Sequence, residues 1–395
     1  MSLTQSECKL KAALAARTNT DAADWYPVFQ ARYGMLAAFR ALRAEAGAGS
    51  VVTQLFTCCT AVTPILAAGL EPIYADISPR SASIDTSRLH LPRDARAVML
   101  QHTFGIVDAE GAGALADMVH EAGVPVLEDC AHCVGRLARD ADDSPLADLS
   151  FHSFGVEKMI DGTHFGGAVW VNPASSFAPL VARVRAQLEA LPAPGVHLRA
   201  LVRAYRVENG VLTHVPGSLS GALRRGLAAA GLFEPAVSSA ELRGTLPHEP
   251  MRAGGWVAGS ALAGMACLDA CEERRRQTVT AYRAAFAGMP GVSVLPAAME
   301  GEPQPLLRFP IFLTDAASAD RALDAVRAEG LYAQAWYRPE LGPGVDDPAA
   351  YRVPTDRSAL PVCTRMSQTV VALPADVGEQ GARRAADAVC AVVSS

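Results

Sequence analysis

Residues 124–135 read VPVLEDCAHCVG, an apolar run that ends in two carboxylates and turns at once into small residues. The run predicts a buried strand of a parallel sheet that finishes at Glu128 and Asp129. A carboxylate at the end of such a strand loses solvation, so its charge needs a cationic partner. An acidic residue before small residues is also a common helix N-cap, and Asp129 alone does not separate the two interpretations.

The next informative stretch is residues 150–172, SFHSFGVEKMIDGTHFGGAVWVN. A predicted strand ends at Ser153, a short link follows, and Lys158 then comes with Val156 and Met159 on either side. A lysine in apolar surroundings has a depressed pKa, which suits nucleophilic or Schiff-base chemistry. Most lysines are solvated surface charges, so Lys158 taken alone is also consistent with an ordinary surface lysine.

The two stretches together indicate one cofactor. Pyridoxal phosphate needs a lysine amine to carry it and a carboxylate paired to its pyridinium nitrogen. Asp129 and Lys158 follow different predicted strands, and the carboxyl ends of parallel strands meet at one edge of the sheet, where such folds bind ligands. The sequence therefore predicts a pyridoxal 5'-phosphate site at that edge, with Lys158 and Asp129 as its catalytic residues.

Outward from these stretches, short β-rich runs alternate with helical segments, which predicts an α/β fold with a mostly parallel sheet. We expect the large domain at residues 1–262, with a lid or interface segment at about 173–250 that has no clean strand. A smaller α+β domain is expected at 263–395. The expected strands are 51–55, 72–75, 97–102, 125–128, 149–153 and 167–171, then 292–295, 306–313, 331–337 and 369–373.

The composition is that of a globular protein: 395 residues, 50% hydrophobic and 19% charged, with a formal net charge of −6. These values exclude a disordered chain and provide no basic field for nucleic acid or an anionic membrane.

Residues 46–70 carry no charge, but their Thr, Gln and Pro favour a buried strand and helix over a membrane span. Nine cysteines and a start without a signal-peptide core predict reduced thiols and a cytoplasmic location. Cys130 and Cys133 lack a second cysteine pair, so no metal site is expected.

The ordered motifs resemble the DegT/DnrJ/EryC1/StrS family of pyridoxal-phosphate-dependent aminotransferases, the sugar aminotransferase branch of fold type I. The resemblance runs from about residue 25 to the end and implies the fold type I architecture. Besides the two stretches above and a helix at 254–283, it is carried by YGMLAAFRALRAEAG, FTCCTAVTPILAAGLEPIYADISPRSASID, MLQHTFG and LPVCTRMSQTVVALP.

The resemblance assigns roles to single residues. Lys158 is similar to the family's Schiff-base lysine and general base, and Asp129 to the carboxylate that contacts the pyridine nitrogen. His132 falls at a position near the cofactor ring. Ser153 matches the serine that binds the phosphate.

The chain departs from the family pattern at the phosphate and at the ring. Tyr33, Gly34 and Met35 align with Ser-Gly-Thr, whose amides and hydroxyl hold the phosphate at a helix start, so Met35 removes a donor. Cys58 stands where the family often has an aromatic residue stacked on the ring. The segment HEPMRAGG lacks the asparagine that partner subunits often donate, and Arg252 is the expected substitute.

Further substrate contacts are expected from His102, Arg252, Trp336 and Tyr337. His102 ends a strand at the same edge, and the segment with Trp336 and Tyr337 resembles the part of the family's small domain that approaches the active site. Core or packing roles explain these side chains as well.

The resemblance implies a homodimer with active sites at the interface, which moves an amino group from glutamate or glutamine to a keto-sugar nucleotide or related cyclic ketone. The altered loop at 163–167 and Cys58 leave open another pyridoxal phosphate reaction: elimination, cyclisation or a carbon–carbon bond step. Met35 and the missing asparagine leave open a non-catalytic dimeric scaffold or sensor.

Overall fold

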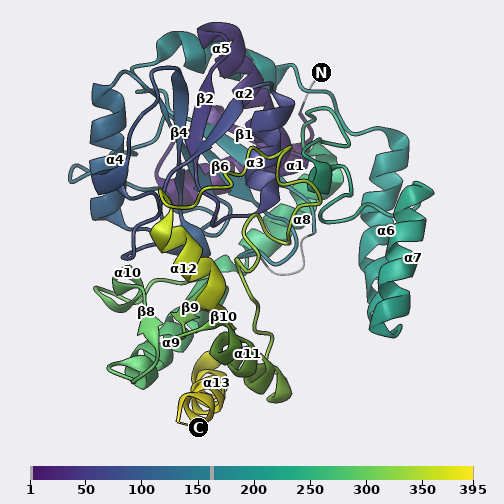
Figure 1. Cartoon of the computed structure of the whole chain (residues 1–395). Helices are drawn as coiled ribbons and strands as arrows, with labels where there is room; N and C mark the ends of the chain where they lie inside the picture. Colours follow the sequence, from purple (N-terminus) through teal and green to yellow (C-terminus); the bar gives the residue numbers. More distant parts are fainter. Residues whose placement is uncertain (1–2, 161–163, 395) are drawn as a thin grey trace.

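The computed structural model describes residues 3–160 and 164–394, and its centre is a seven-stranded sheet (Figure 1). The strand order is β1-β7-β6-β5-β4-β2-β3; β2 to β6 run parallel, and β7 is antiparallel to both of its neighbours. The predicted α/β fold with a mostly parallel sheet is confirmed. The strands are β1 (Trp25–Val28), β2 (Ser50–Thr53), β3 (Glu71–Tyr74), β4 (Ala95–Gln101), β5 (Val126–Cys130), β6 (Leu149–Ser153) and β7 (Gly167–Val171).

Helices cover both faces of this sheet. They are α1 (Gln5–Thr18), α2 (Ala31–Ala46), α3 (Cys59–Ala67), α4 (Ala109–Glu121), α5 (Ala178–Glu189) and α8 (Gly254–Met265), with short 3-10 turns η1 (Ala22–Asp24), η2 (Thr86–Arg88), η3 (Thr103–Gly105) and η4 (Glu241–Arg243). Leu127 and Phe151 share a core with α2 and α5, whereas Val126 shares one with α4, and Cys130 and Trp170 share one with α1 and α8. Successive residues of a strand therefore belong to opposite layers.

A second, smaller sheet follows near the C-terminal end (Figure 1). It has three antiparallel strands in the order β10-β9-β8, and α9, α11 and α13 bury their apolar residues with it. This agrees with the predicted α+β unit. Its elements are α9 (Leu268–Phe286), β8 (Ser293–Val294), α10 (Pro296–Met299), β9 (Arg308–Phe312), α11 (Ala316–Ala328), α12 (Pro361–Thr369), β10 (Val370–Pro374) and α13 (Gly378–Val393).

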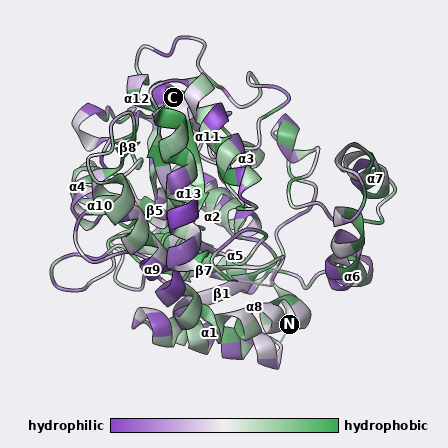
Figure 2. Cartoon of the chain, turned by 90° about the horizontal axis from the view of Figure 1, so that it is seen from below, coloured by the Kyte–Doolittle hydropathy of each residue, from purple (hydrophilic) through white to green (hydrophobic). Residues whose placement is uncertain are grey.

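Residues 173–250 form helices and loops. Among the residues described they carry no strand, which is what the sequence predicts. Besides α5 they form α6 (Val196–Thr213) and α7 (Gly217–Ala229), which stand apart from the sheet in both Figure 1 and Figure 2. Within the described ranges, no helix is both long enough and apolar enough to cross a membrane.

Three expectations about elements need correction. The helix expected at 254–283 is two helices, because the helical conformation is interrupted at residues 266–267, between α8 and α9. The run 331–337 is not a strand: it makes a single bridge, Gln334 to Ala372, and then leaves the small sheet to line a pocket. The sequence pattern does not predict β1, since Pro27 lacks the N–H that an inner strand needs, and β1 is an edge strand.

Candidate active site

A pocket of about 450 Å³ opens at the carboxyl ends of β4, β5 and β6. The first turn of α2, the start of α3 and residues 334–343 close it from the other sides. The sequence predicts a ligand at this edge, and the structure gathers most of the predicted residues there. The predicted residues that line it are Met35, Cys58, His102, Asp129, His132, Ser153, Lys158, Trp336 and Tyr337.

Strand alternation separates the two carboxylates of β5. Asp129 lies on the same face of β5 as Leu127, which faces α2. The Asp129 carboxylate lines the pocket. It is 6% exposed, and within the described part of the chain its hydrogen bond comes from the backbone N–H of Ala131, at 2.9 Å. Burial raises the pKa of Asp129, and the Ala131 N–H and the charge of Lys158 offset part of that shift. The carboxylate is thus short of partners on its pocket side.

Glu128 points to the opposite layer, and its partners make it structural. It accepts hydrogen bonds from His102 Nε2 at 2.8 Å, from the backbone N–H of Ala138 at 2.6 Å and from the Ser150 hydroxyl. His102, a predicted substrate contact, lines the pocket but has its Nε2 committed to this buried carboxylate. The structure therefore gives the His102 ring a core partner.

Lys158 follows β6 and lines the same pocket as Asp129. Burial lowers the pKa of its amine, and the nearby Cys58 and Asp129 offset part of that shift. The Nζ atom lies 5.8 Å from the centroid of the Trp336 ring. An amine with a lowered pKa is neutral in a larger fraction of molecules, which a nucleophile or base requires.

His132 forms a layered arrangement with two aromatic residues of the 334–343 segment. Its ring lies nearly parallel to Trp336, at 5.5 Å and 16°, and to Tyr337, at 6.3 Å and 7°. Its Nδ1 accepts the backbone N–H of Phe104 at 3.1 Å, so the proton belongs on Nε2, which lies 3.2 Å from the Tyr337 hydroxyl. Burial and the charges of Lys158 and Arg308 lower the pKa of His132, which keeps the ring neutral.

The predicted phosphate residues lie around the start of α2. Met35 and Ser153 line the pocket; the Ser153 Oγ accepts the Gly155 N–H at 3.3 Å and so keeps its own proton to donate. Gly34 does not line the pocket. A Cβ on Gly34 would lie 2.5 Å from Val169 on the sheet, so this glycine allows α2 to pack closely.

Cys58 is the N-cap of α3 and lines the pocket. The Thr60 hydroxyl donates to its sulfur at 3.1 Å. Interactions with Cys59, Thr60 and Lys158 outweigh burial and lower the pKa of the Cys58 thiol. Where the family often stacks an aromatic ring, this chain places a thiol that ionises easily.

Two arginines bear on the expected contacts of the pocket. Arg252 does not line the pocket of its own chain: its guanidinium pairs at 2.8 Å with Glu7 of α1, a fully buried carboxylate. The expectation for Arg252 concerns the pocket of a partner subunit, so that contact stays a prediction. The pairing with Glu7 spans 245 residues and gave no local signal in the sequence. Arg32, which the sequence interpretation missed, does line the pocket. A cation in the first turn of a helix opposes the helix dipole, and that is the signal that marks it.

The ligand-forming atoms of His102, Cys130 and Cys133 lie within 4.8 Å of one another in the core. Three donors are one short of a structural zinc site, and the His102 Nε2 already meets Glu128. This cluster lies on the layer opposite to Asp129.

The sequence pattern of the DegT/DnrJ/EryC1/StrS aminotransferase family matches residues 29–177 and 256–393. The chain is 28% identical over 121 residues to GDP-perosamine synthase of Vibrio cholerae, covering 30% of this chain and 32% of that protein. It is 30% identical over 143 residues to dTDP-4-amino-4,6-dideoxy-D-glucose transaminase of Shigella dysenteriae, covering 35% and 38%. These alignments span about a third of each relative.

Solved structures agree over nearly the whole chain in fold. The aminotransferase PseC of Helicobacter pylori superposes with a TM-score of 0.69 at 15% identity, covering 99% of this chain and 92% of that one. 3-Amino-5-hydroxybenzoic acid synthase gives 0.70 at 17% identity, covering 99% and 91%. The family match covers well over half of the sequence, and the fold type I prediction is confirmed by these neighbours. The chain belongs to the DegT/DnrJ/EryC1/StrS aminotransferase family.

Proposed function

We propose that this chain is a pyridoxal-phosphate-dependent aminotransferase that moves an amino group from glutamate or glutamine to a nucleotide-linked keto sugar or related cyclic ketone. The observation that carries the proposal is that Lys158 and Asp129 open into one pocket. The family match and the name of one relative, a dTDP-4-amino-4,6-dideoxy-D-glucose transaminase, support the reaction class.

The residues present fit the cofactor. Asp129 is a buried carboxylate that, among the residues described, accepts one backbone hydrogen bond, so a ring N–H⁺ would give it a hydrogen-bonded cationic partner. Lys158 is well suited to carry the aldehyde because the chain has three lysines and the others, Lys9 and Lys11, belong to α1 and do not line the pocket. Ser153 and the amides of the first turn of α2 would hold the phosphate.

Bound pyridoxal phosphate supplies an electron sink for a carbanion at the donor's α-carbon. The side chains of this protein supply the proton transfers and the orientation. The Lys158 amine, with its lowered pKa, would move a proton from the donor's α-carbon to the C4′ carbon of the cofactor, and in the second half of the reaction it would move a proton from C4′ to the acceptor carbon. Asp129 would stabilise a positive charge on the ring nitrogen. The neutral His132 donates a hydrogen bond to Tyr337 and so fixes one wall of the pocket.

Cations at the rim support an anionic acceptor. Arg327 and Arg338 line the pocket; Arg338 pairs with the exposed Asp320 at 2.8 Å, and the Arg327 Nε donates to the Ala333 carbonyl at 3.1 Å. Both guanidinium groups retain N–H donors, which suit the oxygens of a diphosphate.

The proposal is tested by asking which lysine carries the cofactor. Protein saturated with pyridoxal phosphate should show a visible absorbance band that borohydride removes, and peptide mapping should then find the pyridoxyl group on Lys158. Lys158→Ala should lack both signals, whereas a Lys9→Ala, Lys11→Ala double variant should keep them. A colourless wild-type protein with no response to the cofactor would instead favour the scaffold or sensor.

The reaction type is tested separately. Mass spectra of products from keto-sugar nucleotides and cyclic ketones, with glutamate or glutamine as donor, should show an added amine. Rearranged or shortened products without one would favour elimination, cyclisation or a carbon–carbon bond step. Light scattering tests the proposed homodimer.

A further inference from the structure

Arg32 is a charged residue in an unusual place. It stands in the first turn of α2, lines the active-site pocket and is partly exposed there. α2 has no acidic residue in its first turn, so this cation faces the positive end of the helix dipole without local compensation.

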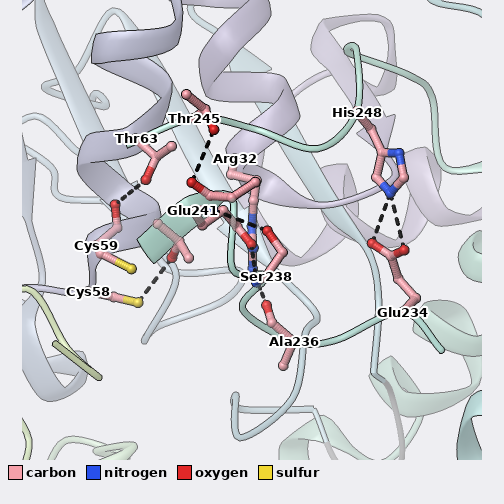
Figure 3. A network of polar contacts seen from close by, with 12 residues as sticks. Arg32, Cys58, Cys59, Thr63, Glu234, Ala236, Ser238, Glu241, Thr245 and His248 are labelled. Carbon is pink, nitrogen blue, oxygen red and sulfur yellow. Dashed lines mark hydrogen bonds and ion pairs between the residues drawn. The ribbon is translucent and has the colours of Figure 1, made fainter. Parts of the chain in front are cut away.

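The segment 173–250 holds the Arg32 side chain in place (Figure 3). Its Nη1 pairs with the carboxylate of Glu241, and its Nη2 donates to the Ala236 carbonyl at 2.9 Å. Glu241 is 1% exposed and is itself fixed by the Ser238 N–H at 2.6 Å. A guanidinium has five N–H donors, so two fixed contacts leave three for another acceptor.

Arg32 lies among the residues that are expected to bind the phosphate of the cofactor. The Gly166-Gly167 pair brings the start of β7 against α2: a Cβ on Gly167 would lie 2.5 Å from the Ala31 backbone nitrogen. Ser153 and Met35 line the same pocket. The positive charge of Arg32 reaches the Lys158 amine, where it contributes to the lowered pKa.

We propose that Arg32 is a ligand of the cofactor phosphate and that Glu241 positions it. Arg32 thereby replaces the hydroxyl that Met35 lacks. The inference rests on the proposed function. It explains why a cation stands at a helix start and why a buried carboxylate orients it: a phosphate dianion in the pocket pairs with the guanidinium and meets the α2 amides.

The test compares the affinities for pyridoxal phosphate and for pyridoxal, which lacks the phosphate, by absorbance titration. Arg32→Gln should weaken pyridoxal phosphate binding about tenfold or more, the loss expected for one charge-assisted hydrogen bond, and leave pyridoxal binding unchanged. Arg40→Gln is the matched control, because Arg40 lies on the same helix, pairs with Glu249 and does not line the pocket. An equal loss for both ligands, or no loss for either, would overturn the inference.

A second measurement needs no variant. Phenylglyoxal modification of Arg32, followed by peptide mass spectrometry, should slow in the presence of pyridoxal phosphate or inorganic phosphate but not of pyridoxal. If bound pyridoxal phosphate leaves the modification rate of Arg32 unchanged, the inference fails while the proposed function stands. If the wild-type protein does not bind pyridoxal phosphate, the proposed function itself fails.

Discussion

The Nε2 atom of His102 lies 2.8 Å from a carboxylate oxygen of Glu128, and both side chains are 1% exposed. For Glu128, burial raises the pKa, but the bonds from His102, Ser150 and Ala138 outweigh it and leave the pKa below its usual value. For His102, burial lowers the pKa, but the charge of Cys133 and the bond to Glu128 outweigh it and leave the pKa raised. The pair therefore links the ends of β4 and β5 directly behind the pocket.

Stability should depend on pH through this pair. The Glu128 contribution is present above about pH 4.3, the free value, and is lost as pH falls through the lower folded pKa. The His102 contribution is present below about pH 6.5 and is lost as pH rises through the raised folded pKa. Glu128→Gln should therefore cost about 3–5 kcal/mol between these values and less at about pH 9. Thermal unfolding of both proteins at the two pH values checks this; an equal cost at both would contradict it.

The sequence predicts every strand of the large sheet except β1, because most of these strands are apolar runs buried on both faces. Two of them, β6 and β7, match to the residue. It also predicts that Lys158 and Asp129 share an edge. The strand pattern alone does not tell which of Glu128 and Asp129 faces the pocket, since a shift of one residue exchanges the faces of a strand, and it is the family resemblance that assigns Asp129.

Other features depend on contacts between distant segments. Arg252 meets Glu7 across 245 residues, and Arg32 meets Glu241 across 209. The run 331–337 has a strand-like composition, yet Trp336 and Tyr337 leave the sheet to stack with His132. Local pattern assigns such a run to a strand, whereas packing at the pocket decides otherwise.

Asp129→Asn should remove the charge at the ring nitrogen while keeping the side-chain size. We expect the turnover to fall about a hundredfold or more, the usual effect of losing one preorganised electrostatic contact, while pyridoxal phosphate still binds through Lys158 and the phosphate residues. Stopped assays of amine transfer and an absorbance titration measure the two effects. Unchanged transfer rates would reject the role assigned to Asp129.

Cys58 should be the most reactive thiol of the pocket. Its lowered pKa keeps the thiolate present at lower pH than in a free cysteine, whose pKa is about 8.5, so alkylation should persist at about pH 6.5. Cys59, whose pKa the same interaction raises, should stay unmodified. Time-resolved iodoacetamide labelling with peptide mapping distinguishes the two sulfurs, and Thr60→Val should slow the labelling of Cys58. Faster labelling of Cys59 would reverse the assignment.

Gly167→Ala should damage both stability and cofactor binding. The new Cβ would lie 2.5 Å from the nitrogen of Ala31 and 2.8 Å from its Cα, and these backbone atoms cannot move without shifting the start of α2. We expect a cost of about 1–3 kcal/mol, as for other overpacked sites. Gly113→Ala is the matched control, since Gly113 lies inside α4, where an added Cβ would meet no described atom within 4 Å, and alanine should stabilise that helix by about 0.5–1 kcal/mol. Melting temperatures rank the three proteins.

Because the shifted helix start carries Arg32 and the first-turn amides, Gly167→Ala should also weaken pyridoxal phosphate binding, whereas Gly113→Ala should leave it unchanged. Equal affinities in both variants would mean that the close approach of β7 to α2 does not shape the phosphate end of the pocket.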